Sequence, residues 1–293
     1  MSTSVDISFD EANEDADVTS IIAEFPPDDV DDSTVSSVPI KKLENAFENI
    51  AKCESTGNST VSQLRVFLRV RPISAKLENT IVVDSETSII STAPMISNRA
   101  KYTKTEERSY TFNRVFGPSS GQDEVFEHSV EPLMDRFLNG ENCVFIAYGM
   151  TNAGKTHTIQ GDTANPGSLP RLVEEIFQRE EILHEECELS LSILEIYQED
   201  IFDLLRPDNK KKEKLKIRDG GEGRMEVSKL SAHSINSSAE AFKLMDQAAF
   251  NRSKSRTLLN SGSSRSHAVY SLVLKKESGM SVFQIVDLAG AER

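Results

Sequence analysis

The sequence predicts an α/β protein with a mixed central sheet and helices on both faces of that sheet. Two observations predict this class. From about residue 63 onward, stretches in which every second residue is apolar, as in a strand, alternate with stretches in which apolar residues recur at helical intervals. Residues 143–149, CVFIAYG, form a continuously apolar run that is too short for a helix of its own, which is typical of a central strand buried on both faces. With 293 residues and 38% hydrophobic content, the chain can fill a real core.

The first part of this region predicts a strand followed by a helix. In QLRVFLRVRP, residues 63–72, apolar side chains occupy alternate positions, and Pro72 closes the strand. Between residues 120 and 140 the apolar positions recur at helical intervals, and Asn139 and Gly140 end that helix. Because Pro132 lies inside the pattern, the helix should kink or turn there.

Strand and helix patterns continue to alternate after residue 149. One helix should follow the glycines, and another should run from about residue 170 to 186. Residues 189–205, LSLSILEIYQEDIFDLL, predict a strand that runs into a short helix. Ser237 and Glu240 form a capping-box pattern that opens a further helix. The stretches 268–276 and 282–290 flank ESGMS, which predicts two adjacent strands joined as a hairpin.

Residues 1–59 form an acidic extension. They contain 14 Asp and Glu against 3 Lys and Arg, which gives −11 of the formal net charge of −14. Few large apolar residues and no periodicity predict a disordered segment ahead of a domain at residues 60–293. The alternative is a regulatory arm, because Ser and Thr beside acids are plausible phosphorylation sites.

Cysteine usage and hydropathy predict a cytoplasmic protein. Cys53, Cys143 and Cys187 show neither metal-ligand spacing nor a disulfide framework, as expected in a reducing compartment. The N-terminus lacks a signal-peptide pattern, and no apolar run approaches the ~18 residues of a membrane span. An acidic composition without interleaved aromatic and basic residues argues against nucleic-acid binding.

The segment after the buried strand fits the pattern G-x-x-x-x-G-K-[ST]. It reads GMTNAGKT, residues 149–156, and a helix pattern follows it. Glycines let backbone N–H groups curl around a phosphate, Lys155 can reach the β and γ oxygens, and the Thr156 hydroxyl can bind Mg²⁺. The alternative is a glycine-bearing turn before a helix.

Two further segments add to this site. Asp287 ends its own apolar strand and is followed by Gly290, a spacing that suits an acid holding the Mg²⁺ shell and an N–H that senses a γ-phosphate. The hydroxyl-rich loop at residues 260–267, NSGSSRSH, lies between a capped helix and a strand. Either segment alone could be an ordinary turn or polar connector.

With these motifs in order, residues 63–293 resemble the motor domain of the kinesin superfamily, a P-loop NTPase fold. The resemblance also includes the segment RVRP at residues 69–72, the stretches 195–197 and 203–205, the Asn251–Arg252 pair and the stretch 287–292. The Thr151–Asn152 pair and the following THTIQG look similar to mitotic, central-spindle kinesins. Ala291 departs from the usual serine. The motors of this family continue past residue 293 with further elements, so the resemblance predicts a motor domain incomplete at its C-terminus.

The resemblance implies ATP and Mg²⁺ as ligands and assigns a role to each matching residue. Those implied to bind the nucleotide are Arg69, Arg71, Pro72, Tyr148, Gly149, Met150, Thr151, Asn152, Ala153, Gly154, Lys155, Thr156 and His157. Those implied to serve hydrolysis are Ser263, Ser264, Arg265, Gly290 and Glu292, with Arg265 and Glu292 as a pair that bridges the two switches. Those implied to hold the metal are Thr156, Ser264 and Asp287.

The implied partner is the microtubule, and the implied location is the cytoplasm and cytoskeleton, including the spindle. A dense basic run, with Lys210, Lys211, Lys212, Lys214, Lys216 and Arg218, could face the acidic tubulin surface or be a solvated loop.

Two alternatives to a microtubule-dependent motor ATPase stay open. One is a non-motile, kinesin-derived protein or fragment that binds nucleotide or regulates other proteins. The other is an ordinary P-loop NTPase, although the chain has no guanine-reading motif.

Overall fold

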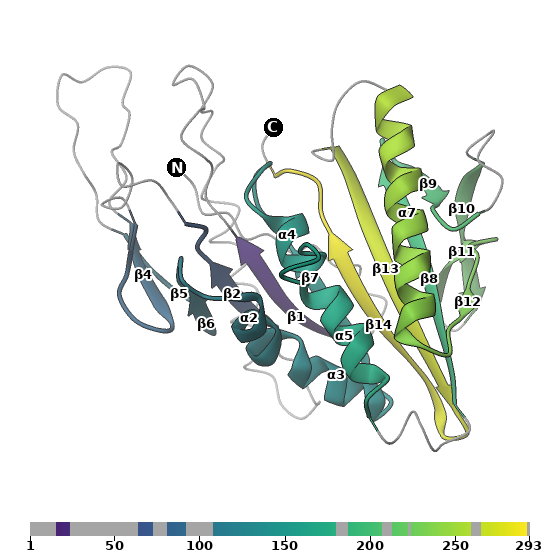
Figure 1. Ribbon diagram of the computed structural model, residues 1–293, viewed down its shortest axis with the longest axis horizontal. Coiled ribbons are helices and arrows are strands. Elements are labelled where there is room, and N and C mark those ends of the chain that lie inside the picture. Colours follow the sequence, from purple (N-terminus) through teal and green to yellow (C-terminus); the bar gives the residue numbers. More distant parts are fainter. Residues whose placement is uncertain are drawn as a thin grey trace.

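A computed structural model describes residues 16–23, 64–72, 81–91, 108–179, 187–206, 213–221, 224–258 and 265–291 of the chain. Within them, one large mixed sheet has the strand order β11-β10-β9-β8-β13-β14-β7-β1-β2-β6, with β12 paired to β8 (Figure 1). Its strands are β1 (Ala16–Ala23), β2 (Arg65–Arg69), β6 (Arg114–Phe116), β7 (Asn142–Ala147), β8 (Glu188–Tyr197), β9 (Asp200–Asp203), β10 (Lys214–Gly221), β11 (Arg224–Ser228), β12 (His233–Ser234), β13 (Ser266–Lys276) and β14 (Gly279–Asp287).

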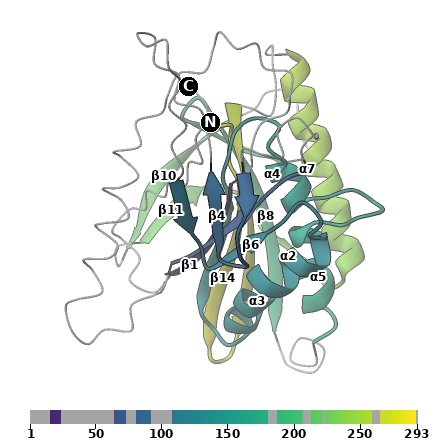
Figure 2. The ribbon, with the colours of Figure 1, turned by 90° about the vertical axis from the view of Figure 1, so that its left-hand side faces the viewer.

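The described helices lie together on one side of this sheet (Figure 2). They are α2 (Gln122–Ser129), α3 (Glu131–Leu138), α4 (Lys155–Ile159), α5 (Ser168–Ile176) and α7 (Ser238–Leu258). Their apolar faces and the facing strand residues form the main core, in which Phe137 and Phe283 meet edge to face with ring centroids 5.7 Å apart. The predicted mixed sheet with helices is confirmed, and in the described part of the chain the helices cover one of its two faces.

Strand β2 serves two cores at once. Phe67 belongs to the main core, whereas Val66, Leu68 and Val70 join a second cluster on the opposite face. That second cluster includes Ile89 of a separate three-stranded sheet, β3 (Ile81–Val83), β4 (Ser88–Ser91) and β5 (Arg108–Thr111), which the sequence did not predict. The alternation in QLRVFLRVRP therefore reflects two buried faces instead of one buried and one solvated face.

Several predicted boundaries are confirmed. The helix pattern at residues 120–140 divides at Val130 into α2 and α3, with Pro132 in the first turn of α3, where the missing N–H costs little. Ser237 accepts a hydrogen bond from the backbone N–H of Glu240 at 3.3 Å ahead of α7. The hairpin of β13 and β14 pairs in register from Ala268 opposite Asp287 to Lys276 opposite Gly279.

The predicted short helix after the strand at residues 189–205 is wrong. The chain forms a hairpin instead, in which β8 and β9 pair from Tyr197 opposite Asp200. The two turn residues, Gln198 and Glu199, have φ of 50° and 68°, as a tight turn of this kind requires. Asn and Gly usually mark such turns, and their absence explains why the sequence did not reveal it.

The structure also differs from the expectation of disorder throughout residues 1–59. Residues 16–23 form β1, which pairs in parallel with β2 on one side and with β7 on the other. Figure 1 shows this strand in purple at the middle of the sheet. Part of the acidic extension is therefore a central strand.

Parallel pairing of β7 with β14 sets up the functional site. Ala147 at the end of β7 lies opposite Asp287 at the end of β14. Because parallel strands end at the same edge of a sheet, the segment after Ala147 and the segment after Asp287 emerge side by side. Helix α4 contacts both strands beneath this edge.

Candidate nucleotide site

The glycine-rich loop leaves β7 and enters α4 as the sequence predicted. Gly149 and Gly154 have φ of 151° and 100°, in the region that favours glycine, and Asn152 adopts φ of 62°. The Lys155 side chain folds back into the loop, where its Nζ donates to the carbonyl oxygens of Gly149 at 2.8 Å and Met150 at 2.7 Å. Lys155 is buried, so the loop holds a positive charge at its centre.

The two predicted metal ligands that the structure describes lie together. The Thr156 hydroxyl donates to Oδ2 of Asp287 at 2.9 Å, although 131 positions separate them in sequence. Asp287 is 2% exposed, so this carboxylate is buried directly beside the first turn of α4. A hydroxyl and a carboxylate are hard oxygen ligands of the kind that Mg²⁺ prefers, so these residues fit the implied ion.

A buried arginine completes the surroundings of Asp287. Arg252 of α7 places NH1 3.3 Å from Oδ2 of Asp287 and donates from NH2 to the carbonyl of Ser266 at 2.9 Å. Its Nε lies 3.6 Å from Oε1 of Glu195 on β8. Arg252 and Glu195 are both buried, and neither has a predicted role beyond its place in the resemblance. No local sequence pattern predicts these contacts, because the residues come from three elements that lie far apart in the chain.

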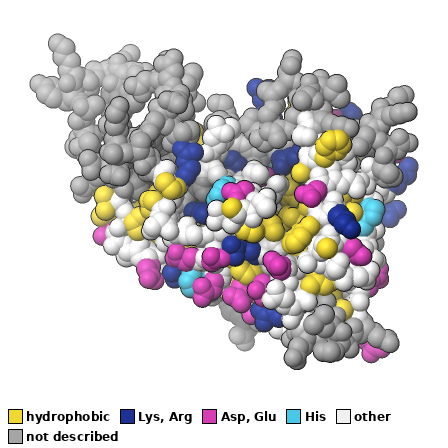
Figure 3. Space-filling view, viewed as in Figure 1, with side chains coloured by type: hydrophobic (Ala, Val, Ile, Leu, Met, Phe, Trp, Pro, Cys, Tyr) yellow, Lys and Arg dark blue, Asp and Glu magenta, His cyan; other side chains and the backbone are white. Residues whose placement is uncertain are grey.

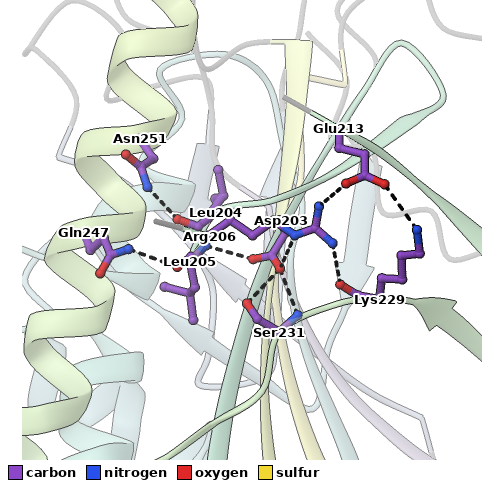
Figure 4. A network of polar contacts seen from close by, with 9 residues as sticks. All are labelled: Asp203, Leu204, Leu205, Arg206, Glu213, Lys229, Ser231, Gln247 and Asn251. Atoms are coloured by element: carbon purple, nitrogen blue, oxygen red, sulfur yellow. Dashed lines mark hydrogen bonds and ion pairs between the residues drawn. The ribbon is translucent and has the colours of Figure 1, made fainter. Parts of the chain in front are cut away.

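A polar network anchors helix α7 close to Arg252 (Figure 4). Gln247 and Asn251 donate to the carbonyls of Leu205 at 3.0 Å and Leu204 at 2.8 Å. Beside them Asp203, whose side chain is 1% exposed, accepts from the backbone N–H and the hydroxyl of Ser231. The position of Arg252 is therefore fixed by its neighbour Asn251 as well as by its own ion pairs.

Residues 288–291 lie against the glycine-rich loop. The N–H of Ala291 donates to the carbonyl of Gly149 at 3.0 Å, and the N–H of Leu288 donates to that of Ala147 at 3.3 Å. These two bonds hold Gly290 beside the loop that should receive the phosphates.

His267 ties the same segment to β13. Its Nδ1 accepts a hydrogen bond from the N–H of Ala289 at 3.0 Å. Burial lowers the pKa of His267 below its usual value, and the Arg252 guanidinium lowers it further, while Asp287 opposes the shift. A neutral imidazole with an unprotonated Nδ1 is what this bond needs.

The resemblance implies that Arg69 and Pro72 pack against the adenine, with Tyr148 and His157 nearby. These residues and Arg71 occupy different environments. Arg71 donates to the carbonyl of Asn152 at 2.7 Å, Pro72 and His157 are exposed, and Tyr148 packs partly against the second cluster. Arg69 is buried at 8% exposure and donates from NH1 to Gln122 at 2.9 Å and Thr158 at 2.8 Å. Its packing against an adenine stays a prediction that this buried position does not favour.

Gln122 is a site neighbour that the sequence did not single out. Besides accepting from Arg69, it donates to the backbone carbonyl of His157 at 2.7 Å. It thereby joins β2, the start of α2 and helix α4.

Some predicted residues lie outside the described part of the chain. Ser263, Ser264 and Glu292 are among them, as are Lys210, Lys211 and Lys212. Arg265 is described and exposed, directly before β13. Its proposed bridge to Glu292 stays a prediction.

Two described residues of the basic run are paired with acids. Lys214 lies 2.7 Å from Asp200, and Arg218 lies 3.3 Å from Glu226. In the described residues no helix is long and apolar enough to cross a membrane.

The fold and site define a protein class, and comparison with known proteins then gives the family. A central strand that ends in this loop, next to a strand that delivers an acid, is the arrangement of P-loop nucleoside triphosphatases. The chain matches the kinesin motor domain family model over residues 69–293 and belongs to that family. The predicted resemblance is confirmed.

Similar proteins carry kinesin names in several organisms. The chain is 33% identical to kinesin-like protein KIN-5A of Oryza sativa subsp. japonica over 262 residues, which cover 78% of this chain and 24% of that protein. It is 30% identical to kinesin-like protein Klp61F of Drosophila melanogaster over 249 residues, 78% of this chain and 23% of that protein. It is 37% identical to kinesin-like protein KIF18A of Mus musculus over 199 residues, 64% of this chain and 22% of that protein. The chain thus spans about a quarter of the length of these relatives.

Proposed function

We propose that the chain binds and hydrolyses Mg-ATP and links its nucleotide state to microtubule binding. The 2.9 Å hydrogen bond between Thr156 and Asp287 carries this proposal, because it joins the phosphate loop to the acid that precedes Gly290. Membership of the kinesin motor family supports the choice of ATP and of microtubules.

The phosphates would lie along the loop, within reach of Lys155. In the structure its ammonium group is held by the carbonyls of Gly149 and Met150, which are weak partners for a buried charge. A phosphate oxygen is a stronger partner, because both members of the hydrogen bond are then charged. Binding of the nucleotide would therefore give the Lys155 ammonium group a stronger hydrogen-bond partner than the two carbonyls.

Thr156 and Asp287 would hold the magnesium ion. Since the Thr156 hydroxyl donates a hydrogen bond to Asp287, the lone pairs of the Thr156 oxygen point away from Asp287 and can bind a cation. Oδ2 of Asp287 already accepts from Thr156 and faces Arg252, so this carboxylate orients the hydroxyl and adds negative charge behind it. When bound, the ion neutralises charge on the phosphates. Ser264 is the remaining candidate ligand.

The switch residues would complete the site around the γ-phosphate. Gly290 lies beside the loop and can offer its N–H, while Ser263 would approach the attacking water. Arg265 and Glu292 would form the bridge that closes the site for hydrolysis. Pro72, Tyr148 and His157 would lie near the base. Arg71, which donates to the carbonyl of Asn152, would lie beside the loop.

Microtubules are the proposed partner, and the cytoskeleton is the proposed location. Figure 3 shows acidic side chains gathered over α2 and α3, where Glu131 and Asp135 lie with Arg179. Repulsion would keep an acidic tubulin surface away from this face. The basic run at residues 210–218 is the better candidate contact.

Turnover of Mg-ATP by the full chain, with and without microtubules, tests the proposal. Lys155→Ala serves as the blank, because it removes the charge in the loop, and Lys243→Ala, at an exposed position on α7, is the matched control. We expect both ATP binding and microtubule-stimulated turnover for the wild type and for Lys243→Ala. ATP binding without stimulation would favour a non-motile, nucleotide-binding role. A wild-type chain that resembles Lys155→Ala in ATP binding would refute the proposal.

A further inference from the structure

One buried hydroxyl next to the nucleotide site has no part in the function proposed above. It belongs to Tyr270 on β13, which is 5% exposed. Strand alternation puts Tyr270 on the same face as Ser266 and Ala268, and Ala268 pairs with Asp287. The tyrosine therefore lies beneath the phosphate loop, one strand away from the metal-side acid.

The hydroxyl has two polar partners from different elements. Nε2 of Gln160 donates to it at 2.6 Å, and the Arg252 guanidinium lies close enough to the hydroxyl to lower the pKa of Tyr270. Burial raises the pKa of Tyr270 to about 12, so the group stays a neutral hydroxyl over the pH range of ordinary assays. It adds no charge that would compete with Asp287 for Arg252.

These contacts close a circuit around the metal side of the site. Gln160 directly follows α4, the helix that begins with Lys155 and Thr156. Arg252 faces Asp287, and Asp287 accepts from Thr156. The circuit therefore runs from Thr156 through α4 to Gln160, across the Tyr270 hydroxyl to Arg252, and back through Asp287.

We propose that Tyr270 is a positioning residue, whose hydroxyl fixes Arg252 and the end of α4 so that Thr156 and Asp287 keep their geometry for Mg²⁺. The inference rests on the proposed Mg-nucleotide function. Packing alone does not require the hydroxyl, because phenylalanine would fill the same apolar surroundings. The Gln160 carbonyl also accepts a hydrogen bond from the Gly167 N–H at 2.9 Å, so the Tyr270 hydroxyl is a second anchor for the end of α4.

Tyr270→Phe isolates the hydroxyl, and the Mg²⁺ dependence of nucleotide binding measures its role. The full chain is titrated with Mg²⁺ at a fixed concentration of fluorescent ATP analogue. We expect the Mg²⁺ midpoint to rise about three- to tenfold in Tyr270→Phe, since the buried hydrogen bond from Gln160 is lost. Affinity without Mg²⁺ should stay near wild type, which a general loss of structure would not allow. Tyr110→Phe, the same change on β5, is the matched control and should leave the midpoint unchanged.

Gln160→Met provides a second route if Tyr270→Phe fails to fold. It removes the donor to the hydroxyl from a half-buried position and should also raise the midpoint. In the double variant the two shifts should not add, because both break the same circuit. Wild-type midpoints in both single variants would overturn the inference while leaving the proposed function intact. A wild-type chain that binds no nucleotide would overturn the proposed function and this inference with it.

Discussion

Strand β1 offers a sharp test of the architecture, because a single substitution can break it. Ile21 of β1 pairs with Ile146 of β7, and β1 also pairs with β2 on its other side. Ile21 resumes the pairing with β7 after a register shift that follows Val18, and we expect its backbone N–H to face one of the two neighbouring strands. Proline at residue 21 removes that donor, and its ring clashes with the neighbouring chain.

The size of the effect follows from the lost ladder bond. One backbone hydrogen bond is worth about 0.5–1.5 kcal/mol, and the carbonyl left buried without a donor costs about 1–3 kcal/mol more. The sum, about 2–4 kcal/mol, is a large part of the ~5–15 kcal/mol that stabilises a typical domain. With a slope near ~2–3 kcal/mol per molar urea, the unfolding midpoint of Ile21→Pro should fall by about 1–2 M.

Urea unfolding of the full chain, followed by far-UV circular dichroism, measures this shift. Ile21→Val is the matched control, since it keeps a β-branched residue and the N–H, and its midpoint should stay near that of the wild type. If Ile21→Pro unfolds at the same urea concentration as Ile21→Val, β1 is not part of the folded sheet. The extension would then be disordered throughout, as its composition predicts.

Three further predictions concern the site. Glu292→Ala should keep ATP binding and lose hydrolysis, because the bridge to Arg265 is lost; turnover at the parental rate would refute that pairing. Arg252→Met should lower the free energy of unfolding by about 3–5 kcal/mol, since the buried carboxylates of Asp287 and Glu195 lose their cation, whereas an unchanged urea midpoint would show that they do not depend on it. His267 has a pKa below its ordinary value of 6.5, so the unfolded chain binds the extra proton first, and stability should fall as pH drops from about 6.5 toward the lower folded value. Comparing urea midpoints of wild type and His267→Asn between pH 7.5 and 5.5 checks this, and equal pH dependence in the two proteins would rule out His267 as the cause.

Much of the site could be predicted because its signals are local in sequence. The glycines at 149 and 154, Lys155 and Thr156 lie within eight residues. Glycine readily adopts the positive φ that the chain has at positions 149 and 154, so the loop conformation can be predicted from these residues alone. Asp287 is marked by the apolar strand that it ends. That these two segments meet could be predicted only from the family resemblance.

The missed features depend on contacts between distant elements. Arg252 and Tyr270 look like ordinary members of an amphipathic helix and a buried strand, because their partners lie on other elements. Likewise β1 carries no apolar alternation that distinguishes it from the acidic stretch around it, and its pairing with β7 is set by the edge that β7 offers. Local propensity cannot reveal pairing of this kind, in which tertiary context decides.

The buried charges explain why this edge of the sheet suits a magnesium nucleotide. Asp287, Glu195 and Arg252 are buried together there, and with the buried Lys155 of the loop this group has two acids and two bases, so its charges balance without a ligand. When phosphates draw Lys155 toward themselves, Arg252 is left between two carboxylates 3.3 and 3.6 Å away. Arg252 and the two carboxylates together then carry a net negative charge, and a buried net charge needs a compensating charge nearby. A divalent cation at Thr156 supplies the compensation, so phosphate and metal should bind more tightly together than either does alone.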